Sequence, residues 1–290
     1  MTATTGTDGR DHSAAGGRAI DETRRRTAPR SRSWARWLLP FATFALALAG
    51  WEALVRINGI PHYILPAPSR ITRALVEDWS ILGPALGVTL GVTLAALLAA
   101  VVGGVLLAIA FTQSRVVEHS LYPFAVVLQV TPVVAIAPLI AIYVDSHTAA
   151  LLLCAWLVAF FPILSNTTLG LSAADANLRN LFAIHGATRW QRLRLLQLPT
   201  ALPYFLGGLR IAGGLALIGA VVAEFVLGTA GAESGLAFRI LEAGYRLNIP
   251  RMFAALALIA ASGIVIYATL GLVSHLLLRR WHESELRHRV

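Results

Sequence analysis

Residues 172–203 read SAADANLRNLFAIHGATRWQRLRLLQLPTALP, a polar, arginine-bearing stretch between long apolar segments. Its first half predicts a short helix, because Ser172 can accept hydrogen bonds from the first amides and Asp175 favours the positive end of the helix dipole. Apolar residues then recur at helical spacing, at Leu178, Leu181 and Phe182. Gly186 stands where such a helix would end in a left-handed residue.

A second helix is predicted directly after this glycine. Thr188 and Gln191 have the spacing of a capping box, and Pro199 is expected to end the helix. Arg189 and Arg192 lie one turn apart, so they share a face of this helix. The stretch therefore predicts a compact helix–turn–helix, a shape suited to passing force to a partner protein.

The composition of the 290-residue chain is that of a membrane protein. Hydrophobic residues make up 57% of it and charged residues only 13%, where soluble domains carry about a quarter. All 24 basic residues are arginines, and eight of them fall in the first 36 residues. This distribution suits anionic lipid headgroups better than nucleic acid. Cys154 is the only cysteine, which excludes a disulfide framework and a thiolate metal site and favours a small buried hydrophobe.

Six apolar segments are long enough to cross a bilayer, so an all-α integral membrane fold with six transmembrane helices is predicted. The predicted spans are residues 35–55, 83–111, 121–143, 148–170, 204–228 and 252–278, within a transmembrane domain over 34–282. The polar stretch 172–203 then joins spans four and five.

The arginine distribution also predicts the orientation of the chain. An even number of spans places both termini on the same side as residues 172–203, and this arginine-rich side is cytoplasmic by the positive-inside rule. Residues 1–33 are predicted to be a disordered basic cytoplasmic tail, and residues 283–290 a short cytoplasmic C-terminal tail. The loops 56–82, 144–147 and 229–251 are expected outside, and residues 112–120 form a short inner loop.

Two apolar regions are irregular. The third predicted span contains Pro123, Pro132 and Pro138, together with Gln129 and Thr131. Helix breaks inside a bilayer are tolerated where protein or a water-filled cavity meets the freed backbone groups. This span is therefore either a pathway-lining helix or a kinked packing helix. The segment 228–250 is too polar to span, and it is either a short external or re-entrant helix or a surface loop.

Two ionisable residues fall within the fifth predicted span. Glu224 lies near its outer end, where it either faces the pathway or is a satisfied interface residue. Arg210 lies near the inner end, where reaching to the cytoplasmic headgroups is the favoured interpretation. Gln129, Pro132, Pro138 and Glu224 are the candidate pathway residues.

Enzyme motifs are missing. A phosphate loop of the Gly-x-x-x-x-Gly-Lys-Ser/Thr type cannot occur in a chain without lysine. There is no histidine pair at metal-ligand spacing, no nucleophile elbow and no paired carboxylates. We therefore predict no catalytic residue, no metal site and no cofactor on this chain, and any ATP and magnesium must be bound by another one.

The polar stretch resembles the cytoplasmic coupling motif, the EAA loop, of bacterial ABC-importer permeases. That pattern is Glu-Ala-Ala, three residues, Gly, nine residues, Ile, any residue, Leu-Pro. Gly186 and Leu198-Pro199 match it in register. Asn180, Leu181 and Phe182 occupy the Glu-Ala-Ala positions, so the usual ion pair between this acidic residue and the ATPase is replaced at best by a hydrogen bond. The resemblance implies ATPase-coupling roles for Asn180, Phe182, Gly186, Arg189, Arg192, Leu198 and Pro199.

Further segments resemble the nitrate/sulfonate/taurine permease group over about residues 60–282. They include Ile64–Ser69, Gln129–Pro132, Ala137–Leu139, Phe161–Gly170 and Gly208–Phe225. The resemblance implies a type I importer permease in the bacterial plasma membrane, without an ATPase site of its own. Its implied partners are ABC ATPase subunits, a second permease subunit, most simply an identical copy, and an external solute-binding protein.

The transported solute stays open at this point. The resemblance implies small nutrients such as taurine and other sulfonates, nitrate, or vitamin precursors such as pyrimidines and riboflavin. Gln129-Val-Thr-Pro132 slightly favours the vitamin precursors. The alternative function is a stand-alone secondary transporter, which would show inverted repeats and several midplane carboxylates. A membrane-embedded enzyme would need clustered acidic residues or histidines.

Overall fold

The computed structural model describes residues 33–229, 231 and 233–279. The predicted tails lie outside these residues, except for Ser33. The chain divides into two compact units, residues 1–54 and 55–290, which are taken separately. In the first unit the described residues belong to one helix, α2 (Ser33–Ile57), which is apolar and long enough to cross a membrane. Its last three residues open the second unit.

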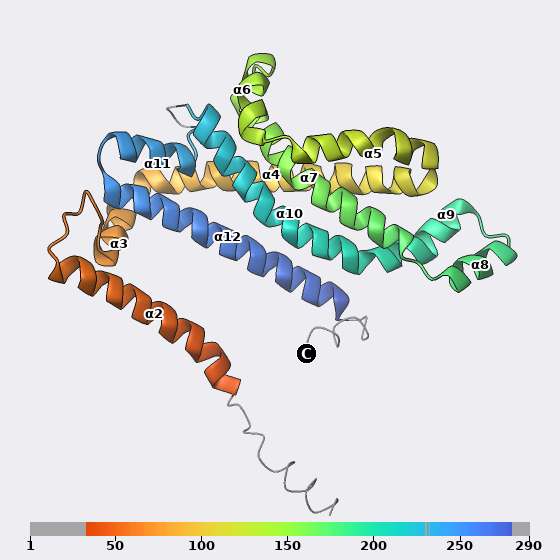
Figure 1. Cartoon of the computed structure of the whole chain (residues 1–290), viewed down its shortest axis with the longest axis horizontal. Helices are drawn as coiled ribbons and strands as arrows, with labels where there is room; N and C mark the ends of the chain where they lie inside the picture. Colours follow the sequence, from red (N-terminus) through yellow and green to blue (C-terminus); the bar gives the residue numbers. More distant parts are fainter. Residues whose placement is uncertain (1–32, 230, 232, 280–290) are drawn as a thin grey trace, which may run out of the picture. The chain divides into compact units, whose positions relative to one another are not determined.

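The core of the second unit is formed by three long helices, α4 (Trp79–Gln113), α7 (His147–Ser172) and α10 (Leu198–Leu227). Their facing sides are rich in alanine, glycine and leucine, which lets the backbones approach closely. Figure 1 shows α7 and α10 side by side, with α12 (Ile249–Leu278) along the other side of α10. Cys154, on α7, is buried in this core, as expected for a small hydrophobe.

Glycines set the closest approach between α7 and α10. A Cβ atom on Gly208 would lie 2.8 Å from the carbonyl oxygen of Pro162 and from the Cβ of Asn166. A Cβ on Gly219 would lie 2.9 Å from the Cα of Ala155. These distances are too short for any other residue, so the α7–α10 contact depends on glycine at these places.

The third predicted span is broken into α5 (Arg115–Val130) and α6 (Val133–Tyr143), which are bent by 104° at Thr131-Pro132. Pro132 supplies the break, since it has no amide to continue the helix. The expected inner loop at 112–120 is wrong: only Ser114 separates α4 from α5, because its side chain accepts a hydrogen bond from the amide of Val117 and starts a new helix at once.

The described residues contain five helices long and apolar enough to cross a membrane, or six if the bent pair α5–α6 forms one span. All regular structure in these residues is helical, which confirms the all-α membrane class. The six-span count itself stays a prediction.

Short helices lie at the two ends of the second unit. At one end are α3 (Pro68–Glu77), which the sequence did not lead us to expect, and α11 (Leu236–Tyr245). The segment 228–250 thus contains a short helix, one of its two expected forms. At the other end are α8 (Ala176–Ile184) and α9 (Arg189–Arg192), next to the turn between α4 and α5 (Figure 1).

Candidate functional site

The helical hairpin α8–α9 begins with a side-chain cap. Asp175 accepts hydrogen bonds from the amides of Asn177 at 2.7 Å and Leu178 at 3.2 Å. Ser172 was expected to share this role, but it is the last residue of α7. The reason is that α7 runs two residues beyond the predicted span, so the capping position falls on Asp175 alone.

The turn of the hairpin has the predicted geometry. Gly186 has a φ of 64°, in the left-handed region that favours glycine. The amides of Gly186 and Ala187 donate to the carbonyl oxygens of Ala183 and Phe182, both at 3.0 Å, which closes the end of α8. Thr188 and Gln191 then form a complete capping box at the start of α9. The turn is therefore held from both sides by hydrogen bonds.

The expected stop at Pro199 is wrong, because the helix continues from Arg189 to Leu227. A π-helical turn at Leu193–Gln197 widens the backbone, with the amide of Leu198 donating to the carbonyl oxygen of Leu193. Pro199 follows in the next turn, where the widened backbone accommodates its missing amide. Leu198 and Pro199 thus form the root that joins the hairpin to the long helix α10. A movement of α9 would therefore pass directly into the bundle.

The hairpin presents large apolar side chains to its surroundings. Ile184 is 82% exposed and Trp190 is 65% exposed, and Leu178 and Leu181 are also exposed. Asn180 is exposed as well, and its side chain makes no hydrogen bond within the described residues. Phe182 is half-buried. Such a surface is typical of a docking site for another protein.

The arginines of the hairpin lie on a different side. Arg189 and Arg192 line a cavity of about 710 Å³ together with Arg115 and Arg179, between the hairpin and the α4–α5 turn. Of the predicted coupling residues, only Arg189 and Arg192 line this cavity. The others lie elsewhere on the hairpin or at its root: Asn180, Phe182, Gly186, Leu198 and Pro199.

The predicted pathway residues are only partly brought together. Gln129, Thr131 and Pro132 line a cavity of about 360 Å³ at the break between α5 and α6, closed by Pro162 of α7 and Leu215 of α10. Among the residues that the structure describes, no charged side chain lines this cavity. Pro138, in the middle of α6, does not line it.

Glu224 lies away from this cavity and caps another helix. It is 1% exposed, and its Oε2 atom accepts a hydrogen bond of 3.0 Å from the amide of Ala237 in the first turn of α11. The hydroxyl of Thr89 on α4 accepts a hydrogen bond of 2.9 Å from the neighbouring amide of Leu236. A Cβ on Gly235 would collide with the Glu224 carboxylate. The carboxylate thus fastens α11 to α10.

Replacement of Glu224 by Ala is expected to loosen α11. A buried amide left without its acceptor costs about 1–3 kcal/mol, so hydrogen exchange in the first turn of α11 should accelerate roughly tenfold or more. Hydrogen-exchange mass spectrometry of peptides covering residues 234–245 measures this. Glu233→Ala removes an exposed carboxylate nearby and should leave the exchange unchanged. Equal exchange in both variants would show that Glu224 does not hold the helix.

The end of the second unit that carries α3 and α11 is rich in ion pairs. Arg251 at the start of α12 forms a bidentate pair with Asp78, with Nε to Oδ2 at 2.7 Å. In α11 the hydrogen bond from Arg239 holds the pKa of the Glu242 carboxyl below its usual range, and Arg246 adds to this. These partners are far apart in sequence or lie in a segment without a spanning pattern, so sequence reasoning missed them.

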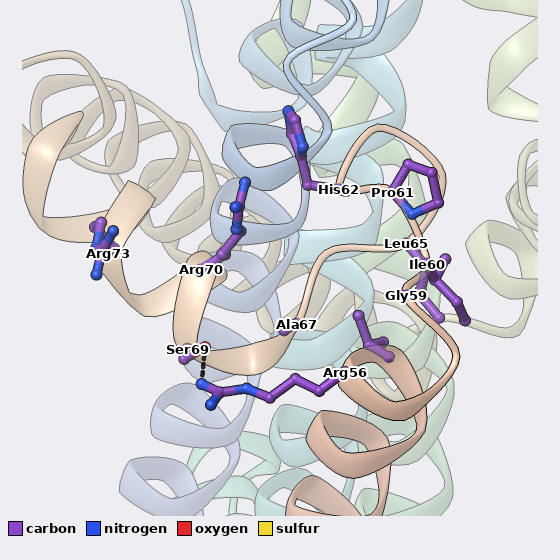
Figure 2. A pocket seen from close by; sticks show the side chains of 11 residues that line it. Arg56, Gly59, Ile60, Pro61, His62, Leu65, Ala67, Ser69, Arg70 and Arg73 are labelled. Carbon is purple, nitrogen blue, oxygen red and sulfur yellow. Dashed lines mark hydrogen bonds between the residues drawn. The ribbon is translucent and has the colours of Figure 1, made fainter.

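A basic cleft of about 510 Å³ lies at the same end. It is lined by Arg56, His62, Arg70 and Arg73, with Arg56 donating to the hydroxyl of Ser69 at 3.4 Å. Figure 2 shows the side chains of Arg70 and His62 pointing the same way, with Arg56 below them reaching to Ser69. None of the described residues that line the cleft is acidic, so it attracts negatively charged groups.

Comparisons with known proteins agree on one family. Residues 78–283 match the model of the binding-protein-dependent transport system inner membrane component family. The chain is 37% identical to the riboflavin transport system permease protein of Chloroflexus aurantiacus, over 89% of this chain and 97% of that protein. It is 32% identical to the formylaminopyrimidine transport permease protein of Halalkalibacterium halodurans, over 86% of this chain and 97% of that protein.

A solved structure shares the fold. It is the crystal structure of an amino acid ABC transporter with histidines. The match covers 71% of the present chain and 96% of a chain in that structure, with a TM-score of 0.56 and 18% sequence identity. The arrangement of the spans around α4, α7 and α10 is therefore a known one.

Proposed function

This chain belongs to the binding-protein-dependent transport system inner membrane component family, the permease subunits of ABC importers, and from that premise we propose that its α8–α9 hairpin receives force from a separate ATPase chain. The observation that carries the proposal is the hairpin itself, a capped turn with exposed Ile184 and Trp190 at the root of α10. ATP is bound together with magnesium and hydrolysed on the partner, on the cytoplasmic side of a bacterial plasma membrane.

The solute pathway runs past the break between α5 and α6. Its cavity offers an amide at Gln129 and apolar walls, without a charge to balance an anion. Placing a sulfonate or nitrate in such a cavity would cost several kcal/mol, whereas an uncharged planar ring with hydrogen-bonding edges fits its chemistry. We therefore assign a neutral heteroaromatic vitamin or vitamin precursor as the solute class, in keeping with the relatives that are riboflavin and formylaminopyrimidine permeases.

The pathway is completed by a second copy of this chain. In one chain Gln129 and Leu128 at the cavity are exposed, as is most of α6, so the cavity is closed on one side only. A homodimer would place two such cavities around a shared axis. The other function considered from the sequence, a stand-alone carrier, receives no support from the family match.

The basic cleft at the opposite end of the unit faces outward in this orientation. It would receive acidic side chains of the external solute-binding protein, since charge complementarity guides such docking. Arg70 and Arg73 both come from α3 and lie one turn apart.

Affinity purification tests the proposed function. The chain should co-purify with an ABC ATPase from its native membrane, and this association should be lost when residues 180–192 are scrambled. A chain that purifies alone, both with and without the scrambled segment, would overturn the coupling role of the hairpin.

The double substitution Arg70→Glu, Arg73→Glu should weaken docking of the solute-binding protein. Reversing these two charges should raise the Michaelis constant for the loaded binding protein about tenfold or more at low salt. The rate of ATP hydrolysis at a saturating concentration of binding protein should change little. ATP hydrolysis by the reconstituted importer, titrated with binding protein, measures this. Arg246→Glu reverses a charge at the same end but outside the cleft, and is expected to change the titration less. Equal shifts in both variants would contradict docking at the cleft.

A further inference from the structure

The cavity behind the hairpin contains an uncompensated cluster of positive charge. Its lining includes Arg115 at the start of α5, Arg179 on α8, and Arg189 and Arg192 on α9, with Glu118 as its one acidic side chain. Within the described residues, none of these four arginines forms a hydrogen bond or ion pair through its side chain. Four guanidinium groups around one space repel each other unless an anion lies between them.

An apolar groove is lined by α4 and α7, which also line this cavity, and by α10. It has a volume of about 450 Å³ and is lined by Val102 and Leu106 of α4, Thr167 of α7 and Leu202 of α10, among others. The two spaces share sequence neighbours: Thr168 and Gln197 line the basic cavity, and Thr167 and Leu198 line the groove. The linings of the charged and the apolar space therefore include consecutive residues on α7 and at the start of α10.

Two hydroxyl groups lie on the consecutive residues of α7 that line the two spaces. The Oγ1 atoms of Thr167 and Thr168 are buried and have no hydrogen-bond partner within the described residues. Thr167 as a residue is only 2% exposed. Buried hydroxyls are normally bonded, so these two donors are left for a bound oxygen-rich group.

We propose that the basic cavity and the apolar groove together bind one anionic phospholipid, with its phosphate among Arg115, Arg179, Arg189 and Arg192 and an acyl chain along Val102 and Leu106. Guanidinium groups match phosphate oxygens in geometry and charge. In this arrangement the two threonine hydroxyls would donate to the glycerol ester oxygens between the headgroup and the chain. The groove identifies the ligand as a lipid, because a free phosphate would leave it empty. This proposal does not depend on the ATPase partner.

The test is retention of phospholipid by the detergent-purified full chain. Chains from membranes containing phosphatidylglycerol are delipidated in steps, and bound lipid is counted by native mass spectrometry. The double substitution Arg115→Gln, Arg179→Gln should lower lipid retention about tenfold or more, because the loss of each guanidinium removes a charge-assisted hydrogen bond to the phosphate. Arg194→Gln is the matched control: Arg194 lies in the π-helical turn directly after α9 but does not line the cavity, so this variant should retain lipid normally.

A second pair of measurements separates the lipid from a free anion. Val102→Trp fills the groove and leaves the arginines in place, so it should also reduce lipid retention. Inorganic phosphate at millimolar concentration should raise the melting temperature less than phosphatidylglycerol does. The proposal is overturned if the double variant Arg115→Gln, Arg179→Gln retains as much phospholipid as the Arg194→Gln variant. It is also overturned if phosphate stabilises as well as lipid and Val102→Trp has no effect.

Discussion

Gly186→Val is expected to lower solute-coupled ATP turnover about tenfold while the bundle stays folded. Gly186 has a φ of 64°, and no atom lies within 4 Å of where its Cβ would be, so the penalty is one of backbone conformation alone. A β-branched residue is strongly disfavoured there, and about 1–2 kcal/mol of strain shifts the turn and the capping box behind it. ATP hydrolysis of the importer reconstituted with its loaded binding protein measures the loss.

Gly207→Val is the matched control for this substitution. Gly207 also has open space at its Cβ position but lies in α10 with an ordinary helical φ. Gly186→Asn should recover much of the activity, since asparagine tolerates the left-handed region better than other residues. If Gly186→Val and Gly207→Val had equal turnover, the conformation of the turn would not matter for coupling.

Gly208→Val is expected to have the largest effect on stability. Its Cβ would lie 2.8 Å from the backbone oxygen of Pro162, and a backbone atom cannot move aside as a flexible side chain can. Overpacking of this kind costs about 1–3 kcal/mol or more, and here it separates α7 from α10 at the core of the unit. The melting temperature in detergent should fall by several degrees, and the yield of folded protein should fall with it.

The neighbouring residue again provides the control. Gly207→Val adds the same side chain one position earlier, on the open side of α10, and should leave the melting temperature nearly unchanged. If Gly207→Val and Gly208→Val had the same melting temperature, the close approach of α7 and α10 at Gly208 would be refuted.

The sequence predicted those features that depend on neighbours in the chain. The turn at Gly186 and the capping box at Thr188–Gln191 were found because each is a local hydrogen-bonding unit of a few residues. The long apolar helices followed from length and hydropathy, and the prolines of the third span predicted an irregular helix without indicating which proline would break it. Local chemistry was sufficient for these elements.

Features that depend on distant partners were not predictable in the same way. The Arg251–Asp78 pair joins residues 173 apart, and the Thr89–Leu236 bond joins residues 147 apart. The expected end at Pro199 failed because a π-helical turn, invisible in the pattern of residue types, accommodates the proline. Glu224 could be singled out as a membrane carboxylate, but only the fold places it on the first turn of α11.

The central claim is that the α8–α9 hairpin meets the ATPase, and thiol cross-linking in native membranes tests it most directly. Cys154 is buried and is the only natural cysteine, so an introduced thiol is the only accessible one. Ile184→Cys, on the exposed side of the hairpin, should form an adduct with an ABC ATPase. Tyr245→Cys, 88% exposed at the opposite end of the unit, should form none. An ATPase adduct from Tyr245→Cys, with none from Ile184→Cys, would contradict both the docking surface and the orientation.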